Sequence, residues 1–241
     1  MKPHNEDPTG KKEQVRAMFD AIARRYDLLN HLLSMNIDRR WRARVVRAVK
    51  HQAPRRVLDL ATGTGDLAIA VARALPEAEV TGMDLSPEML RIGREKVAER
   101  FPGRPFPMLE GDAEELPFAD ASFEAVTCAF GVRNFEYLTR GLEEMHRVLT
   151  PGGGIYILEF SMPSQRNLLG RLYRFYFKSV LPAIGRLVSK DARAYTYLPE
   201  SVGEFPYGER FCRLLAEAGF RSPQAHRLTG GIATVYTATR P

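Results

Sequence analysis

The chain has 241 residues, and its 44% hydrophobic and 27% charged residues are ordinary values for a globular protein. It contains no run of about 18 apolar residues, which excludes a membrane-spanning helix, and its polar start excludes a signal peptide. We therefore expect a cytoplasmic location. The net charge of +6 is compatible with nucleic acid, an anionic membrane surface or a solvated basic face. The two cysteines, Cys128 and Cys212, lack metal-ligand spacing and are predicted to be buried free thiols.

Residues 1–14 lack hydrophobic periodicity and are predicted to form a flexible tail, followed by a single domain over 15–241. Helical spacing begins at Val15 and stops at Tyr26, and 27–36 are expected to form a turn into a short element. Arginines then alternate with apolar residues over 39–49, which predicts an amphipathic helix within an N-terminal cap, 15–52. Its basic face suits either solvent or an anionic surface.

Strand patterns alternate with helix patterns from Arg55 onwards. Such alternation predicts an α/β fold with a doubly wound, mostly parallel, seven-stranded sheet. Two C-terminal strands joined by Thr229-Gly230-Gly231 predict an antiparallel ribbon at one edge. The predicted strands are 56–60, 79–84, 106–110, 123–130, 154–160, 220–227 and 231–239, and the predicted helices between them are 66–75, 87–100 and 136–149.

An insertion over 162–206 separates the fifth strand from this ribbon. It combines leucines and aromatic residues with lysines and arginines, and no acidic residue occurs between Glu159 and Asp191. Extra structure at the ligand-bearing edge of such a sheet commonly shapes a substrate site. We expect a helical lid on the substrate side.

A ligand cradle is predicted at residues 57–66, where a buried strand meets a glycine turn and a helix start. Gly63-x-Gly65-x-x-Ala68 satisfies the dinucleotide pattern, and Asp84 follows Gly65 by 19 residues, at the end of the next strand. A carboxylate there can accept both ribose hydroxyls. This much fits NAD and S-adenosylmethionine equally well.

Two further features favour S-adenosylmethionine. Asp59, inside the first strand, suits a ligand with a cationic amino-acid end, or fixes the turn, whereas a pyrophosphate gains nothing from it. Asp112-Ala113 after the third strand can bond an adenine amino group and let the ring lie flat. With the turn at 150–154, these spacings resemble the class I S-adenosylmethionine-dependent methyltransferases.

Motifs outside the cradle narrow the resemblance. These motifs are Val15-x-x-Met18-Phe19-Asp20-x-Ile22-Ala23-x-x-Tyr26-Asp27-x-x-Asn30, Leu33-Ser34, Trp41-Arg42, Phe130-Gly131-Val132-Arg133-Asn134, Leu158-Glu159-Phe160-Ser161-x-Pro163, Tyr195-x-Tyr197-Leu198-Pro199-Glu200-Ser201 and Phe205-Pro206. With them, the chain from about residue 15 to 239 is similar to the menaquinone and ubiquinone C-methyltransferase family. One departure is Asn36, where the family usually carries glycine, and it concerns the local turn.

The resemblance implies a set of cofactor contacts. Asp84 would bind the ribose, and Asp112 with Ala113 the adenine. Structural alternatives are a helix N-cap for Asp84 and a self-capping loop carboxylate for Asp112. The remaining contacts would come from the turn and the strand before it: Gly63, Thr64, Gly65 and Asp59.

The resemblance also implies the reaction. The family methylates a ring carbon of a reduced, polyprenylated quinone, which needs in-line positioning and an acceptor for the ring proton. Arginine is a poor base, so Arg133 would stabilise a quinolate oxygen electrostatically, and Asn134 would orient a water. The structural alternative is an ion pair of Arg133 with a carboxylate and a turn formed by Asn134. Tyr195, Tyr197 and Ser201 would line the ring pocket, or simply pack in the insertion. The insertion would contact a membrane surface transiently, or complete the core under a lid.

Several functions stay open beside this one. The family accepts naphthoquinols and benzoquinols, and we favour demethylmenaquinol over 2-methoxy-6-polyprenyl-benzoquinol. The basic charge keeps an RNA methyltransferase in view, but the chain lacks an Asn-Pro-Pro-Tyr-like motif and we expect no nucleic-acid partner. An NAD-dependent oxidoreductase is disfavoured by Asp59 and Asp112, and a non-catalytic sensor by Arg133-Asn134. We expect no metal, and a homo-oligomer is compatible with the sequence.

Overall fold

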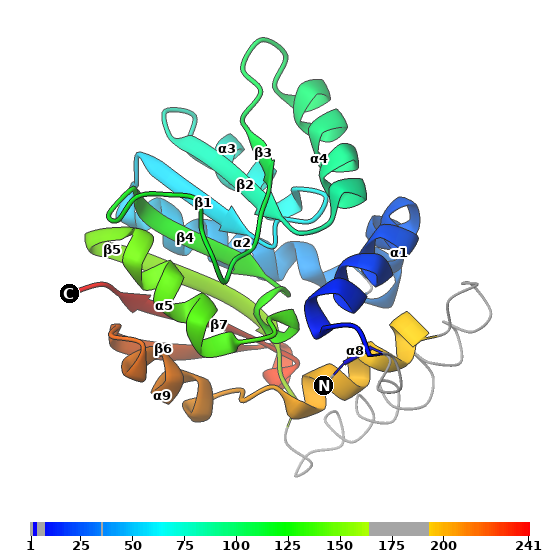
Figure 1. The fold of residues 1–241 in the computed structure, drawn as a ribbon. Coiled ribbons are helices and arrows are strands. Elements are labelled where there is room, and N and C mark those ends of the chain that lie inside the picture. Colours follow the sequence, from blue (N-terminus) through cyan, green and yellow to red (C-terminus); the bar gives the residue numbers. More distant parts are fainter. Residues whose placement is uncertain (1, 4–7, 35, 164–192) are drawn as a thin grey trace.

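A computed structural model describes residues 2–3, 8–34, 36–163 and 193–241 (Figure 1). The centre of the molecule is a seven-stranded sheet of order β3-β2-β1-β4-β5-β7-β6. Its strands are β1 Arg56–Leu60, β2 Glu79–Asp84, β3 Met108–Glu110, β4 Phe123–Ala129, β5 Leu149–Phe160, β6 Arg221–Leu228 and β7 Ala233–Thr239.

Strand direction confirms the predicted fold class. β1, β2, β3, β4 and β5 pair in parallel, while β7 runs antiparallel to both β5 and β6. The predicted C-terminal ribbon is therefore present, with β7 inserted between β5 and the edge strand β6. The chain leaves β1 and β4 towards opposite sides of the sheet, so a crevice opens between their carboxyl ends, where ligands bind in such folds.

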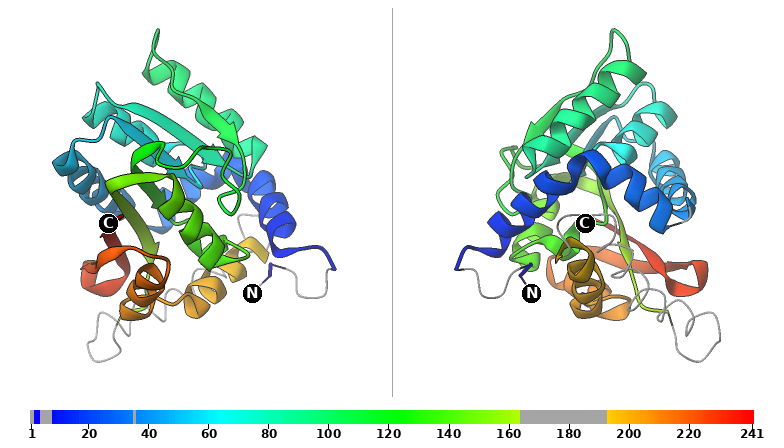
Figure 2. Two further views of the ribbon diagram at one scale, coloured as in Figure 1. Left: turned by 60° about the vertical axis from the view of Figure 1, so that its left-hand side comes forward. Right: turned by 90° about the vertical axis from the view of Figure 1, so that its right-hand side faces the viewer.

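Helices cover both faces of the sheet (Figure 2). One apolar cluster joins the sheet to α5 (Leu138–Val148) and α9 (Glu209–Glu217). A second joins the other face to α2 (Ile37–Gln52) and α3 (Asp66–Ala74), and a third joins α3 to α4 (Pro87–Arg100). The central strands β1 and β4 are buried on both faces, which explains their continuous apolar runs.

The N-terminal helix is longer than predicted. α1 spans Lys11–Leu33, so it begins inside the predicted tail and continues through the predicted turn. Its first turn is fixed by polar contacts, which hydrophobic periodicity cannot reveal: the Lys11 amide donates to Glu136 Oε1 (3.1 Å). Beyond Asp27 the segment contains four leucines, residues of high helix propensity that favour continuation of the helix.

Asn36 precedes α2 with a left-handed backbone (φ 60°, ψ 10°). Glycine adopts that conformation freely, and asparagine is among the few other residues that tolerate it. The departure from the family pattern therefore preserves the local turn.

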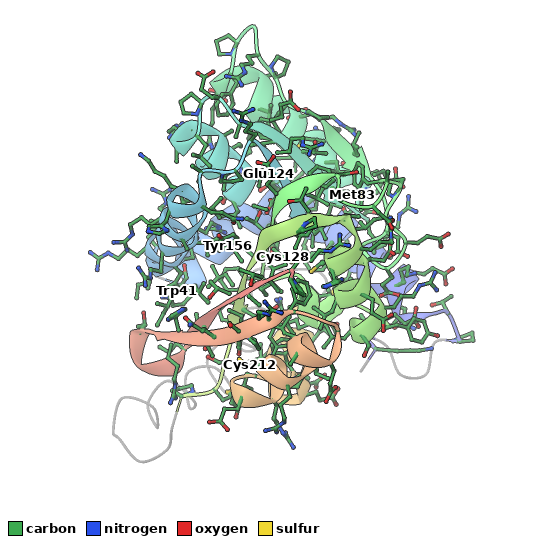
Figure 3. All side chains as sticks on the ribbon, turned by 90° about the vertical axis from the view of Figure 1, so that its left-hand side faces the viewer. Trp41, Met83, Glu124, Cys128, Tyr156 and Cys212 are labelled. Atoms are coloured by element: carbon green, nitrogen blue, oxygen red, sulfur yellow. The ribbon has the colours of Figure 1, made fainter. Side chains whose placement is uncertain are left out.

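Only part of the predicted insertion can be compared. α8 spans Arg193–Glu204 and is helical as expected, while 164–192, including most of the predicted lid, lie outside the described residues. Both cysteines are free thiols, as predicted (Figure 3). Cys128 in β4 is buried, as expected, whereas Cys212 on α9 is only partly buried. Among the described residues no helix is long and apolar enough to cross a membrane.

Candidate functional site

A cleft lies at the carboxyl edge of the sheet, where the segments after four strands meet under α1. Its free space, counting the part open to solvent, is ≈ 730 Å³. The cleft is lined by Ala61 and Gly63 after β1, Asp84 to Ser86 after β2, Gly111 to Glu114 after β3, Ala129 to Gly131 after β4, Asn134 to Glu136, and residues of α1 and α4.

Asp59, in β1, fixes the turn that follows this strand. Its carboxylate accepts hydrogen bonds from the hydroxyls of Thr62 (2.6 Å) and Thr127, and the side chain is 1% exposed. Burial raises the pKa of Asp59 to about 6, against the opposing effect of these bonds. Asp59 does not line the cleft. Its contacts fit the turn-fixing alternative better than a direct bond to a ligand.

The turn presents only part of the predicted set to the cleft. Gly63 lines it with φ 56°, and a Cβ at this position would meet no atom within 4 Å, so the glycine supplies backbone conformation. Thr64 is 2% exposed and its hydroxyl accepts a hydrogen bond from Lys96 of α4 (3.0 Å). Gly65 packs towards Met108. Neither Thr64 nor Gly65 therefore lines the cleft.

Asp84 lies at the end of β2 and lines the cleft. Its two oxygens accept hydrogen bonds from the backbone N–H groups of Gly63 (2.8 Å) and Ser86 (2.9 Å). Burial raises the pKa of Asp84, while these backbone bonds lower it. The carboxylate therefore ties the β1 turn to the start of α4 and keeps lone pairs for ribose hydroxyls. The N-cap of α4 is Ser86, whose hydroxyl accepts from Met89 N–H (3.2 Å).

Asp112 and Ala113 form another wall of the cleft, after β3. Asp112 Oδ1 accepts a hydrogen bond from the Glu114 N–H (2.9 Å), so the self-capping alternative describes one oxygen, while Oδ2 pairs with Lys12 of α1. Ala113 is small and buried, and leaves room beside the carboxylate. Together with Asp84, these residues fit the hydroxyl and amino groups of an adenosine.

α1 closes the cleft from above, a role that the sequence did not indicate. Lys12 pairs with Asp112 and lies 3.6 Å from Glu114 Oε2, while Lys11 Nζ donates to the Arg133 carbonyl (3.2 Å). Further along, Asp20 accepts hydrogen bonds from the Ser86 hydroxyl and the Glu88 N–H. In the right-hand view of Figure 2, α1 runs across the edge of the sheet.

Arg133 and Asn134 belong to a short 3-10 helix, η1 (Val132–Asn134), after β4. Asn134 lines the cleft, and its Oδ1 is buried without a hydrogen-bond partner among the described residues. Arg133 does not line it. Its Nη1 forms an ion pair with Glu159 Oε1 (2.9 Å), as the structural alternative predicted, while its Nε is buried and unpartnered in the same part of the chain. Glu159 was not among the predicted site residues.

The predicted ring-pocket residues lie on α8. Tyr197 is buried, packs with Val15 and Met18 of α1, and its hydroxyl has no partner among the described residues. Burial raises the pKa of Tyr197 to about 12, so the phenol remains protonated at neutral pH. Ser201 is also buried. Tyr195 belongs to the helix, but its side chain lies outside what the structure describes.

Metal binding has no support in the described part of the chain. No group of three or more His, Cys, Asp or Glu side chains there is arranged to hold a metal ion. The cleft instead combines acidic side chains, a glycine turn and apolar walls, which suits a nucleoside.

The chain is similar to known proteins over nearly its whole length. The ubiE/COQ5 methyltransferase family matches residues 8–240. A demethylmenaquinone methyltransferase of Deinococcus radiodurans is 48% identical over 100% of both chains. The ubiquinone/menaquinone biosynthesis C-methyltransferase UbiE of Geotalea daltonii is 49% identical over 96% of this chain and 98% of its own length.

Solved structures share the fold at low identity. Human N-acetylserotonin methyltransferase, in complex with SAM, superposes with a TM-score of 0.64 at 20% identity, covering 96% of this chain and 60% of the human chain. A SAM-dependent methyltransferase of Thermotoga maritima gives a TM-score of 0.63 at 21% identity, covering 93% and 99%.

Proposed function

The chain belongs to the ubiE/COQ5 methyltransferase family, and we propose on this premise that it transfers the methyl group of S-adenosylmethionine to a ring carbon of demethylmenaquinol, giving menaquinol. The observation that carries this proposal is the full-length identity of 48% with a protein named demethylmenaquinone methyltransferase. Relatives of the same name from Bacteroides fragilis and Porphyromonas gingivalis are 45% and 48% identical.

The cleft residues suit the methyl donor. Asp84 would bind the ribose hydroxyls, Asp112 the adenine amino group, and Gly63 would lie against the methionine end. S-adenosylmethionine supplies an electrophilic methyl group when it is bound. The role of this chain is to hold the quinol carbon in line with that methyl, and positioning of this kind lowers a barrier by up to ~7–11 kcal/mol.

The quinol would meet η1 and α8. An ionised or strongly hydrogen-bonded quinol hydroxyl makes the ring carbon a better nucleophile. The Nε–H of Arg133, which has no partner among the residues that the structure describes, is a donor suited to that oxygen. Asn134 Oδ1 can accept a hydrogen bond from a water that removes the ring proton after transfer. Tyr197, and with it Tyr195 and Ser201, would bound the ring.

A benzoquinol is the second candidate acceptor. It is favoured by two relatives of this chain, from Geotalea daltonii and a Geobacter species. Both are 49% identical to it, and the names of these two proteins cover ubiquinone and menaquinone biosynthesis. The two acceptors differ in the size of the ring that the site must take.

The test incubates the purified chain with methyl-labelled S-adenosylmethionine and reduced demethylmenaquinone or the reduced benzoquinol, each with a short prenyl tail. Label in the naphthoquinol fraction is expected, with a lower rate for the benzoquinol. Label in the benzoquinol alone would reverse the order of the two acceptors. Label in neither quinol, with S-adenosylmethionine binding intact, would refute the proposed reaction.

We also propose a transient contact with an anionic membrane surface, from which a polyprenylated quinol would be drawn. One support is the outer face of α2, whose exposed side chains include Arg39, Arg40, Arg44, Arg47 and Lys50. The single acid of α2, Asp38, is buried and pairs with Arg42, so this face carries one sign of charge. Each such cation contributes about 1 kcal/mol near an anionic surface. The cationic insertion, 162–206, is the other support.

Sedimentation with phosphatidylglycerol vesicles tests this contact. Binding is expected to be lost in neutral vesicles, at high salt, and in either R44E/R47E on α2 or R171E/R174E/K178E in the insertion. R210E/R213E on α9, on the other face of the sheet, is the matched control and should bind as the wild type does. Unchanged sedimentation of both charge-reversed variants would exclude a contact through these surfaces.

A further inference from the structure

Glu159 is a buried carboxylate that the proposed reaction does not yet use. It lies near the end of β5, is 0% exposed, and is fixed by three donors. Arg133 Nη1 (2.9 Å) and the Phe160 N–H (2.8 Å) donate to Oε1, and the Arg133 N–H donates to Oε2 (3.4 Å). The guanidinium also lies 5.7 Å from the centre of the Phe160 ring. Glu159 therefore holds both the backbone and the side chain of Arg133.

Several buried polar atoms near this ion pair have no hydrogen-bond partner among the described residues. They are Arg133 Nε, Asn134 Oδ1 and Tyr197 Oη. Arg133 and Asn134 share η1, and α8, which carries Tyr197, packs against η1. A donor, an acceptor and a hydroxyl left unpaired in one buried region would all be costly in the absence of a ligand. They match the hydrogen-bonding needs of a ring hydroxyl and a water.

Fold stability alone does not account for the pair. Replacing a buried ion pair by apolar residues of similar volume is often neutral or stabilising, so burial of Glu159 and Arg133 is weak evidence for a stabilising role. The geometry instead gives the nitrogen atoms of one guanidinium different partners. Nη1 binds Glu159 and the Phe130 carbonyl, whereas Nε has no hydrogen-bond partner within the part of the chain that the structure describes.

We propose that Glu159 is a positioning residue of the methyl-transfer site, whose carboxylate orients the Arg133 guanidinium so that Nε–H is held ready for the quinol oxygen. This inference rests on the proposed function and extends it to a residue that never touches the substrate. The carboxylate also balances the charge of Arg133 in a site that must accept a sulfonium cation.

Substitution of Glu159 tests the proposal. E159Q keeps an oxygen near Arg133 but loses the charge, and a fall in kcat of about 30-fold is expected, less than the roughly 100–1,000-fold cost of removing a preorganised donor outright, because the guanidinium itself remains. The dissociation constant of S-adenosylmethionine should stay within about twofold, because the cofactor cleft does not include Glu159. E159D keeps the charge with a shorter reach, and an intermediate kcat is expected.

E144Q is the matched control. It breaks an ion pair with Arg147 (2.7 Å) on α5, outside the cleft lining, so it should lower the unfolding temperature and leave kcat unchanged. The double variant R133Q/E159Q should be no slower than R133Q, because Glu159 acts through Arg133.

The pH profile gives a readout that a purely structural role would not move. Burial raises the pKa of Glu159 and Arg133 lowers it, and Tyr197, Tyr236 and Cys128 are the other titratable groups that its charge affects. The kcat of the wild type should fall in acid as Glu159 takes up a proton, and this limb should be absent in E159Q.

The outcomes separate the two proposals. A wild-type kcat in E159Q would overturn the positioning role. So would a fall in kcat from R133Q to R133Q/E159Q as large as the fall from the wild type to E159Q. If E159Q does not fold, E159D decides: normal S-adenosylmethionine affinity with wild-type kcat overturns the role, and reduced kcat supports it. Absence of transfer by the wild-type chain would instead refute the proposed function.

Discussion

Two carboxylates at the ends of adjacent strands have different roles. Asp84, at the end of a strand, was predicted to bind the ribose, and Asp59, inside the strand before the turn, was predicted to contact the cofactor or to fix the turn. Asp59 is enclosed by Thr62 and Thr127, whereas Asp84 faces the cleft and accepts two backbone N–H groups. Sequence position located both residues at the correct edge of the sheet. It could not show which one the threonines would enclose.

The stability of the fold should depend on pH through Asp59. Its pKa is raised to about 6 in the folded chain, so the folded state holds this proton more tightly than the unfolded state and stability falls as pH rises from about 4 to 6. The lost stability is on the order of 3 kcal/mol. D59N lacks this titrating group, so its stability should not fall in this pH range. As the pH rises, the unfolding free energy of D59N minus that of the wild type should therefore increase by about this amount.

Urea unfolding of both proteins at pH 4.5 and pH 7 measures the difference. An equal gap between D59N and the wild type at the two pH values would contradict the raised pKa.

Substitution of Asp84 should weaken the binding of S-adenosylmethionine more than substitution of any other residue of the cleft. D84N keeps one acceptor but places an amide NH₂ against a backbone N–H, and the loss of a charged hydrogen bond costs about 1.5–3 kcal/mol. S-adenosylmethionine should therefore bind about 10–100-fold more weakly in D84N, as measured by calorimetry. D120N, at an exposed carboxylate paired with Arg147, is the control. Equal affinities of D84N and the wild type would place the ribose elsewhere.

At the scale of elements, the central strands and the helices between them follow from the sequence, because β1 and β4 are apolar runs bounded by turns. The middle of α1 was also predicted, but its ends were not. Its first turn is fixed by an ion pair with Asp112 and by hydrogen bonds to Arg133 and Glu136, which are 100 or more residues away. Thr64 shows the same limit, because the spacing of the glycine turn does not reveal that its hydroxyl faces Lys96 of α4. Long-range polar contacts are therefore what the sequence pattern could not supply.

The attachment of α1 should control how fast the cofactor leaves. K12A removes the ion pair with Asp112 and the nearby charge of Glu114, which loosens the first turn of α1 at the rim of the cleft. The dissociation rate of S-adenosylmethionine is expected to rise about fivefold, since the lost interaction is a partly exposed ion pair. Stopped-flow displacement measures it, with R91A on α4 as the control. An unchanged rate in K12A would show that α1 does not gate the cleft.

The junction of β1 and β4 is packed too closely for any side chain at Gly131. A Cβ there would lie 2.4 Å from the Cβ of Ala61 and 2.8 Å from Cys128 Sγ. G131A should therefore destabilise the fold by about 1–3 kcal/mol and displace the wall of the cleft. G203A is the matched control, because a Cβ at Gly203 in α8 meets no atom within 4 Å. Equal urea midpoints for G131A and the wild type would contradict this packing.

At the scale of the whole molecule, the sheet brings both halves of the proposed reaction to one edge. Asp84 and Asp112 follow β2 and β3 on one side of the crevice, while Asn134 follows β4 on the other. The doubly wound order, the antiparallel ribbon and the methyl donor were predictable, because each depends on strand patterns and local motifs. The identity of the carboxylate that pairs with Arg133 and the packing of Tyr197 against α1 were not, because they depend on how β5, α8 and α1 come together.

The most direct test of the central claim is the position of the transferred methyl group. Purified chain, S-adenosylmethionine and demethylmenaquinone are incubated with and without a reductant, and the product is analysed by mass spectrometry and NMR. Methylation at a ring carbon is expected in the reduced sample only, because the quinone ring is a poor nucleophile. A methyl group on a hydroxyl oxygen, or equal reaction of the oxidised quinone, would contradict it.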